Sequence, residues 1–257
     1  MISTAAACVV LWKRASAVRW RWFWIGAAVW TAGVVLKNVF SAIANKDALS
    51  WLNSHLPHWG YPAAASLYIG LLTGIFGIGT AFFAARRWPA MTFSADRAIA
   101  VGLGAGAFEA LLMGLSPLIT GIIVVTGNFK PDPHTYQELL KSLAIPAYVL
   151  IGTVERIIVI LCHTASRGLV LLAVARGRMQ SFWWAFLLMT GLDAVVGWTY
   201  FSGFMKTRSE WWVELMILPF GILSVYVIVR LLKRWPSEGT GPEKTPFVPE
   251  LEKKPGL

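Results

Sequence analysis

Residues 154–172 form an apolar run that ionisable side chains interrupt at Glu155, Arg156, His163 and Arg167. The surrounding apolar stretch has the length of about 20 residues that an α-helix needs to cross a bilayer. On a helix, Arg156, His163 and Arg167 share one narrow stripe, and Glu155 lies one position round from it. An ionised side chain at the bilayer centre costs about 3 kcal/mol or more, so such groups face a bundle interior and find partners there. This segment therefore predicts a membrane protein with a buried polar site.

The composition identifies the class of protein. Hydrophobic residues make up 56% of the 257 residues and charged residues only 14%, and several apolar runs are long enough to span a membrane. We therefore predict an all-α, polytopic membrane helical bundle. The net charge of +10 is spread over loops and tail, without a basic cluster that alternates with aromatic side chains. This pattern predicts contact with anionic lipids and excludes a nucleic-acid partner.

We expect about seven membrane-spanning helices, at residues 1–12, 22–43, 62–85, from 98 onward, 146–173, 182–201 and 211–232. The first is short, because 12 residues make only about 18 Å of helix, and the alternative is a half-buried helix. Pro117 is expected to bend or end the fourth span, and a weaker apolar run at residues 118–125 can continue it.

The loop charges predict the orientation. Basic segments at residues 13–21, 86–97, 176–178 and 233–234 alternate with nearly neutral loops at residues 46–61, 126–141 and 206–210. Because basic loops stay in the cytoplasm, the N-terminus is predicted outside and the C-terminus inside. We expect residues 1–235 to form a single transmembrane domain. Residues 236–257, with five prolines and mixed charge, are expected to be a disordered cytoplasmic tail.

Two further spans carry one carboxylate each near their centre. Glu109 lies in the motif GLGAGAFEALLMG, and Asp193 lies in FLLMTGLDAVVGW. Three consecutive spans thus place ionisable groups in the middle third of the bilayer, and we expect a polar pocket between them. The glycines before Glu109 remove bulk where another group can approach. On the third span, Gly70 and Gly74 predict close helix packing.

Such a pocket contains the groups that hydrolysis requires. A carboxylate can act as general base on a water molecule, and a neutral histidine can hold that water or donate to a developing oxyanion. We assign catalysis to Glu109, His163 and Asp193, and support to Glu155, Arg156 and Arg167, with Glu155 and Arg156 as an orienting pair. The alternative is a set of buried ion pairs that only fix the helix register, with Asp193 paired to an arginine or a histidine.

The same side chains offer nitrogen and oxygen ligands for zinc. Neither an HExxH-like pair with i, i+4 spacing nor a Cys/His zinc motif occurs, and Cys162 lies mid-span, which argues against a disulfide. The residues therefore require no cofactor and leave zinc open, with Glu109, His163 and Asp193 as candidate ligands.

The motifs resemble those of a known family. A glycine-rich stretch with one glutamate, a Glu-Arg pair and a histidine on the next span, and then FWWAFLLMTGLDAVVGW, are similar to bacterial YhfC-type membrane proteins. These are grouped with type II CAAX prenyl proteases and PrsW-like glutamic intramembrane proteases. The segments also look like the scaffold subunit of gamma-secretase. The resemblance follows the span order over residues 20–235, and its motifs lie within residues 102–198.

The resemblance implies a role for each motif. It makes Glu109 the water-activating glutamate, places the Glu-Arg pair in the second motif, and makes His163 the histidine of that motif. Relatives carry a histidine on the sixth span, where this chain has Met189 or Asp193, and the doubled glutamate of better-known relatives is absent. It also implies an integral protein of the bacterial cytoplasmic membrane.

Three functions follow from these observations. The first, which we expect, is a glutamic-type intramembrane protease, with metal assistance left open, that cleaves a membrane protein or a lipidated peptide. The second is a catalytically inactive relative that stabilises a partner membrane subunit, which the missing sixth-span histidine favours. The third is a small transporter, because intramembrane carboxylates also serve as relays, although the sequence has no inverted repeat.

Overall fold

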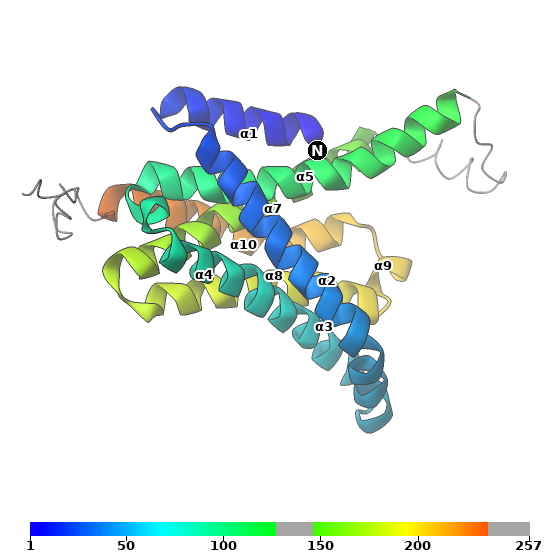
Figure 1. Ribbon diagram of the computed structural model, residues 1–257. Coiled ribbons are helices and arrows are strands. Elements are labelled where there is room, and N and C mark those ends of the chain that lie inside the picture. The colour runs from blue at the N-terminus through cyan, green and yellow to red at the C-terminus, as the bar shows by residue number, and fades with distance from the viewer. Residues whose placement is uncertain (127–145, 236–257) are drawn as a thin grey trace, which may run out of the picture.

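The computed structural model describes residues 1–126 and 146–235, within which all regular elements are helical (Figure 1). This confirms the predicted all-α fold. The elements are α1 (Ile2–Ala15), α2 (Arg21–His55), α3 (Tyr61–Leu72), η1 (Thr73–Ile78), α4 (Gly79–Arg87), η2 (Pro89–Thr92), α5 (Ala95–Val125), α7 (Pro146–Arg176), α8 (Met179–Phe201), α9 (Phe204–Thr207) and α10 (Trp211–Arg234). The segment η1 is π-helical, and η2 is a 3₁₀ turn. The predicted loop after Thr126 and the predicted tail at 236–257 lie outside the described residues.

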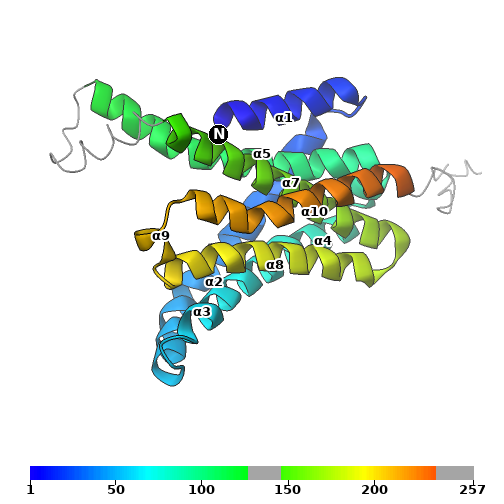
Figure 2. The ribbon, with the colours of Figure 1, turned by 180° about the vertical axis from the view of Figure 1, so that it is seen from behind.

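Within the described part, six helices are long and apolar enough to cross a membrane: Arg21–His55, Tyr61–Arg87, Ala95–Ile123, Leu150–Arg176, Met179–Phe201 and Trp211–Arg234. They coincide with six of the spans expected from the sequence. The other expected span is α1, which has 14 residues and packs along α5 (Figures 1 and 2). The chain is an integral membrane protein, and the orientation of its ends stays a prediction.

The predicted loop at residues 46–61 is wrong over its first part, because α2 continues to His55. Residues 46–55 contain neither glycine nor proline, so nothing in them stops a helix. The helix ends before Leu56, which precedes Pro57, and a proline disfavours helical geometry in the residue before it. As a result, the C-terminal part of α2 extends past the neighbouring helices (Figure 1).

The helix α5 passes through Pro117 and continues to Val125. A proline inside a helix removes one backbone hydrogen bond, and membrane helices tolerate this loss because neighbouring groups satisfy the freed carbonyl. The apolar run at residues 118–125 therefore continues the fourth span, as the sequence allowed, and Pro117 does not end it.

Three glycines bring α5 directly against two other helices. A Cβ atom on Gly104 would lie 2.0 Å from the backbone oxygen of Phe23 in α2. A Cβ atom on Gly102 would lie 2.5 Å from the Cα atom of Thr164 in α7, and Gly106 faces the same helix. The space before Glu109 is thus filled by neighbouring backbones.

The helix α7 is the centre of the bundle, with α5, α8 and α10 packed around it (Figure 2). Its spanning segment is the most buried of the six candidate spans. The close helix packing predicted at Gly70 and Gly74 is present, and the partner is α8: a Cβ atom on Gly70 would lie 2.3 Å from the backbone oxygen of Thr190, and Gly74 faces the same residue. Because α7 carries the charged stripe, its central place removes these charges from the lipid.

Replacement of Gly104 by alanine should destabilise the protein by about 1–3 kcal/mol, because the new Cβ forces α2 away from α5. The matched control is Gly79→Ala, since a Cβ atom at Gly79 meets nothing within 4 Å. Alanine there should be neutral or stabilising, because it lowers the entropy of the unfolded chain. Thermal unfolding of the purified full-length variants in detergent measures both effects. Equal unfolding temperatures for the two variants would contradict this packing.

Candidate functional site

The polar pocket predicted from the sequence exists as a cavity of about 320 Å³ inside the bundle. Its walls come from α5, α7 and α8, as expected, and also from α2 and η1, which the sequence did not suggest. The site residues proposed from the sequence all line it, namely Glu109, Glu155, Arg156, His163, Arg167 and Asp193. The positions of the ionisable groups along three spans therefore predicted their common location.

Nitrogen donors from two other helices surround the carboxylate of Glu109. Trp30 Nε1 in α2 donates to Oε2 over 2.9 Å, and His163 Nε2 in α7 lies 2.7 Å from the same oxygen. The other oxygen, Oε1, lies 3.4 Å from Arg156 Nη1. One carboxylate of α5 thus joins three helices. The sequence interpretation did not include Trp30, because a tryptophan inside an apolar span gives no signal beyond packing.

The guanidinium of Arg156 joins two carboxylates. Its Nη1 atom faces Glu109, and its Nη2 atom pairs with the adjacent Glu155. The side chain of Arg156 is 9% exposed and that of Glu155 is 33% exposed. Glu155 therefore lies at the more open part of the cavity, and Arg156 lies behind it. The predicted Glu-Arg pair is present, and it is linked directly to Glu109.

The carboxylate of Asp193 is held by α2 and η1. Thr73 Oγ1 donates to its Oδ2 atom, and Lys37 Nζ lies 3.5 Å from that oxygen and 2.5 Å from Thr73 Oγ1. The alternative in which Asp193 pairs with an arginine or a histidine is therefore wrong, and its partner is Lys37. The sequence does contain a signal for it, because a single lysine inside an apolar span needs a buried acid.

Two buried polar atoms at or near these ion pairs, in Glu214 and in His163, have no hydrogen-bond partner among the described residues. Glu214 in the first turn of α10 is 6% exposed, and no described residue donates a hydrogen bond to its Oε2 atom. It interacts electrostatically with Glu155 and Arg156. Among the described residues, His163 Nδ1 also has no hydrogen-bond partner. The sequence interpretation did not single out Glu214, although a glutamate at the start of an apolar span was visible.

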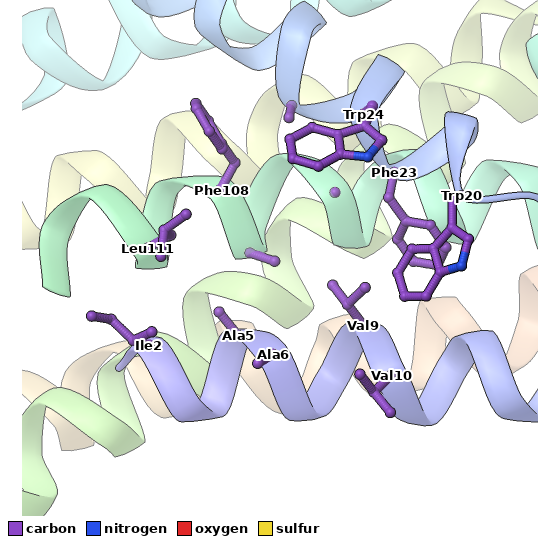
Figure 3. A pocket seen from close by; sticks show the side chains of 13 residues that line it. Ile2, Ala5, Ala6, Val9, Val10, Trp20, Phe23, Trp24, Phe108 and Leu111 are labelled. Carbon is purple, nitrogen blue, oxygen red and sulfur yellow. The ribbon is translucent and has the colours of Figure 1, made fainter. Parts of the chain in front are cut away.

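A separate apolar groove of about 380 Å³ lies between α1, α2 and α5 (Figure 3). Side chains such as Val9, Trp24 and Leu111 line it, and none of its lining residues is titratable. Phe108 lines this groove and packs edge-on against Trp30, which lines the polar cavity. The two spaces are therefore neighbours, and of the two it is the polar cavity that is lined by titratable side chains.

A model of the YhfC intramembrane metalloprotease family matches residues 1–217. The chain belongs to this family. The match includes every described residue that lines the polar cavity and confirms the family expected from the motifs. No curated protein and no solved structure matches the chain.

The name of the YhfC family implies a metal ion, which needs a group of suitable ligands in this chain. Within residues 1–126 and 146–235, no three His, Cys, Asp or Glu side chains are grouped to hold one. Glu109 and His163 face each other at hydrogen-bond distance, and Asp193 is engaged by other side chains. A catalytic zinc site uses three protein ligands, and the cation Arg156 beside Glu109 opposes a second positive charge. The described residues therefore do not fit a metal ion.

Replacement of Arg156 by glutamine should lower the free energy of unfolding by about 3–5 kcal/mol, because it leaves two carboxylates without their guanidinium. The matched control is Arg178→Gln, which removes an exposed charge and should change stability by less than about 0.5 kcal/mol. Denaturant unfolding of purified protein in mixed micelles measures both. An Arg156→Gln variant as stable as the control would show that the ion pairs do not hold the bundle.

Proposed function

We propose that this chain is a glutamic-type intramembrane protease that hydrolyses a peptide bond in or near the bilayer. The observation that carries the proposal is the 2.7 Å contact between Glu109 Oε2 and His163 Nε2 in a cavity of the membrane domain. A carboxylate beside an imidazole supplies the groups that general acid–base catalysis uses. Membership of a family described as intramembrane metalloproteases supports the reaction class.

The two oxygens of Glu109 have different surroundings. In this proposal the difference decides which of them acts as the general base. Oε2 is contacted by Trp30 and His163 at 2.9 and 2.7 Å. Within residues 1–126 and 146–235, the polar contact of Oε1 is with Arg156 Nη1 at 3.4 Å, which is longer than an ordinary N–H···O hydrogen bond. Oε1 therefore keeps a lone pair for a water molecule. In this proposal Oε1 takes a proton from the attacking water and later returns it to the leaving amine.

The other site residues position this base. His163 holds Oε2 through Nε2 and so fixes the orientation of the carboxylate. Asp193 connects α8 to α2 and η1 through Lys37 and Thr73, so in place of the catalytic role expected from the sequence we propose a positioning role that keeps the walls of the cavity together. Glu155 orients Arg156 toward Glu109.

The proposed substrate is a segment of a membrane protein or a lipidated peptide. Its backbone has to reach Glu109 between helices, so the scissile bond must lie in an extended stretch and not in a helix, whose carbonyls are already hydrogen-bonded. The basic segments at residues 13–21 and 86–97 suit anionic lipids, and we propose the bacterial cytoplasmic membrane as the location.

A non-catalytic scaffold for a partner membrane subunit is the second candidate. The observation that favours it is the absence of a histidine from α8, where Met189 is buried and Asp193 is already paired. In this case the ion pairs hold the helices and no bond is cleaved.

The substitution Glu109→Gln should abolish cleavage, with a loss of about 10²–10⁴-fold in rate, because an amide cannot accept the proton of water. The measurement is mass spectrometry of membrane-protein N-termini from cells that carry either form. New N-termini near membrane segments should disappear with the variant and persist with Glu210→Gln, which changes an exposed glutamate. Identical N-termini in all samples, together with co-purification of one partner by every form, would establish the scaffold instead.

Chelation should not affect the enzyme. Because the described residues do not assemble three ligands, treatment with EDTA or 1,10-phenanthroline should leave the cleavage rate unchanged. Elemental analysis of the purified protein should find less than stoichiometric zinc. Stoichiometric zinc, with cleavage lost on chelation and restored by added metal, would refute a metal-free site.

A further inference from the structure

We propose that the guanidinium of Arg167 binds the carbonyl oxygen of the scissile bond as it becomes an oxyanion. The inference rests on the proposed function, because it assigns the electrophilic group of the same reaction. Hydrolysis of an amide needs a donor for the developing negative charge as well as a base. His163 Nε2 is already engaged by Glu109 Oε2 at 2.7 Å, so a donor that is still unused has to come from another residue of the cavity.

Arg167 is buried and faces the cavity. Its residue surface is 2% exposed, and it lines the same 320 Å³ space as Glu109 and His163. Its Nη1 atom donates to Ser166 Oγ over 3.0 Å. Its remaining N–H groups have no acceptor among the described residues, although Arg167 interacts electrostatically with Glu109 and Asp193. A fixed guanidinium with unused donors is suited to bind an oxygen anion.

The other two cations of the cavity are already engaged. Arg156 pairs with Glu109 and Glu155, and Lys37 pairs with Asp193 and Thr73. In the part of the chain that the structure describes, no carboxylate lies within ion-pair distance of Arg167. It is therefore the cation whose donors a substrate can use without breaking an ion pair.

The position of Arg167 relative to the base also suits this role. Arg167 follows His163 by four residues on α7, so the two side chains lie on one face of the helix about 6 Å apart along its axis. Gly77 of η1 lies opposite, where a Cβ atom would be 3.6 Å from Arg167 Nη2. Both residues line the cavity, and a side chain at position 77 would stand over Nη2, which glycine avoids.

The reaction step balances without a further reactant. The oxygen of water bonds to the carbonyl carbon while Glu109 Oε1 takes one proton, and the π electron pair of the carbonyl moves to its oxygen, beside Arg167. The pair then restores the carbonyl as the C–N bond breaks. The leaving nitrogen takes the proton from Glu109. The products are a carboxylic acid and an amine.

The test uses three synthetic probes on purified full-length protein in detergent. They are N-acetyl-Leu-Leu amide, its phosphinic analogue with an anionic PO₂ group in place of the peptide bond, and N-acetyl-Leu-Leu with a free carboxylate. The phosphinate imitates the tetrahedral oxyanion, whereas the carboxylate places the anion at the chain end. Dissociation constants are measured after dialysis against a chelator. Because this removes metal ions that could bind the phosphinate, the remaining affinity reports binding to the protein's own side chains.

The wild type should bind the phosphinate about 100-fold more tightly than the amide, and Arg167→Gln should remove this preference. Arg167→Lys keeps the charge without the planar fork and should retain an intermediate preference. Gly77→Leu keeps Arg167 and places a side chain over its guanidinium, so it should also lower the affinity for phosphinate. This variant replaces Arg167→Gln in the test if Arg167→Gln does not fold. Glu109→Gln should retain the preference for phosphinate over amide. The binding test of Arg167 is therefore independent of the cleavage test of Glu109.

Three outcomes would overturn the assignment. The first is a wild type that binds phosphinate and amide equally. The second is an unchanged phosphinate preference when Arg167 is replaced or covered. The third is an Arg167-dependent preference for the free carboxylate, which would make Arg167 a site for a chain terminus. Cleavage that survives in Glu109→Gln would refute the proposed base and leave the result for Arg167 intact.

Discussion

The pairing of ionised groups in a low-dielectric interior is the constraint on which the rest of this structure depends. The cavity is lined by three carboxylates and three cations, namely Glu109, Glu155, Asp193, Lys37, Arg156 and Arg167. An isolated ion of this kind costs several kcal/mol, whereas a pair with good contacts offsets much of this cost. Because the pairs connect α2, α5, α7 and α8, they determine how the helices are placed as well as which chemistry is available between them.

Close backbone packing makes these pairs possible. The glycines of α5 allow the backbones of α2 and α7 to approach the backbone of α5 closely, and Trp30 and His163 thereby contact the same oxygen of Glu109. Van der Waals contact is the main source of helix association in lipid, since lipid chains are as apolar as the side chains they contact. The glycines before Glu109 therefore serve the site indirectly, through the helices that they bring to it.

The sequence predicted those parts of the site whose positions follow from helical periodicity and from depth in the membrane. The stripe on α7 follows from helical spacing, and the depth of Glu109 and Asp193 follows from the length of their spans. The contributions of Trp30 and Thr73 could not be predicted in this way, because they depend on how α2 and η1 cross the other helices. The end of α2 was placed too early, because polar residues suggested a loop where no residue stops the helix.

The π-helical segment η1 rotates the two halves of one membrane span, α3 and α4, relative to each other about the helix axis. Each residue of an α-helix turns the chain by about 100°, and a π-helical turn accommodates an additional residue, so the faces of α3 and α4 do not continue one another. Before η1 the span packs on α8, and after it the span packs on α2 and α7. A single transmembrane helix thereby serves two different neighbours, and the phase change between them lies at the residues that meet the cavity, Thr73 and Gly77.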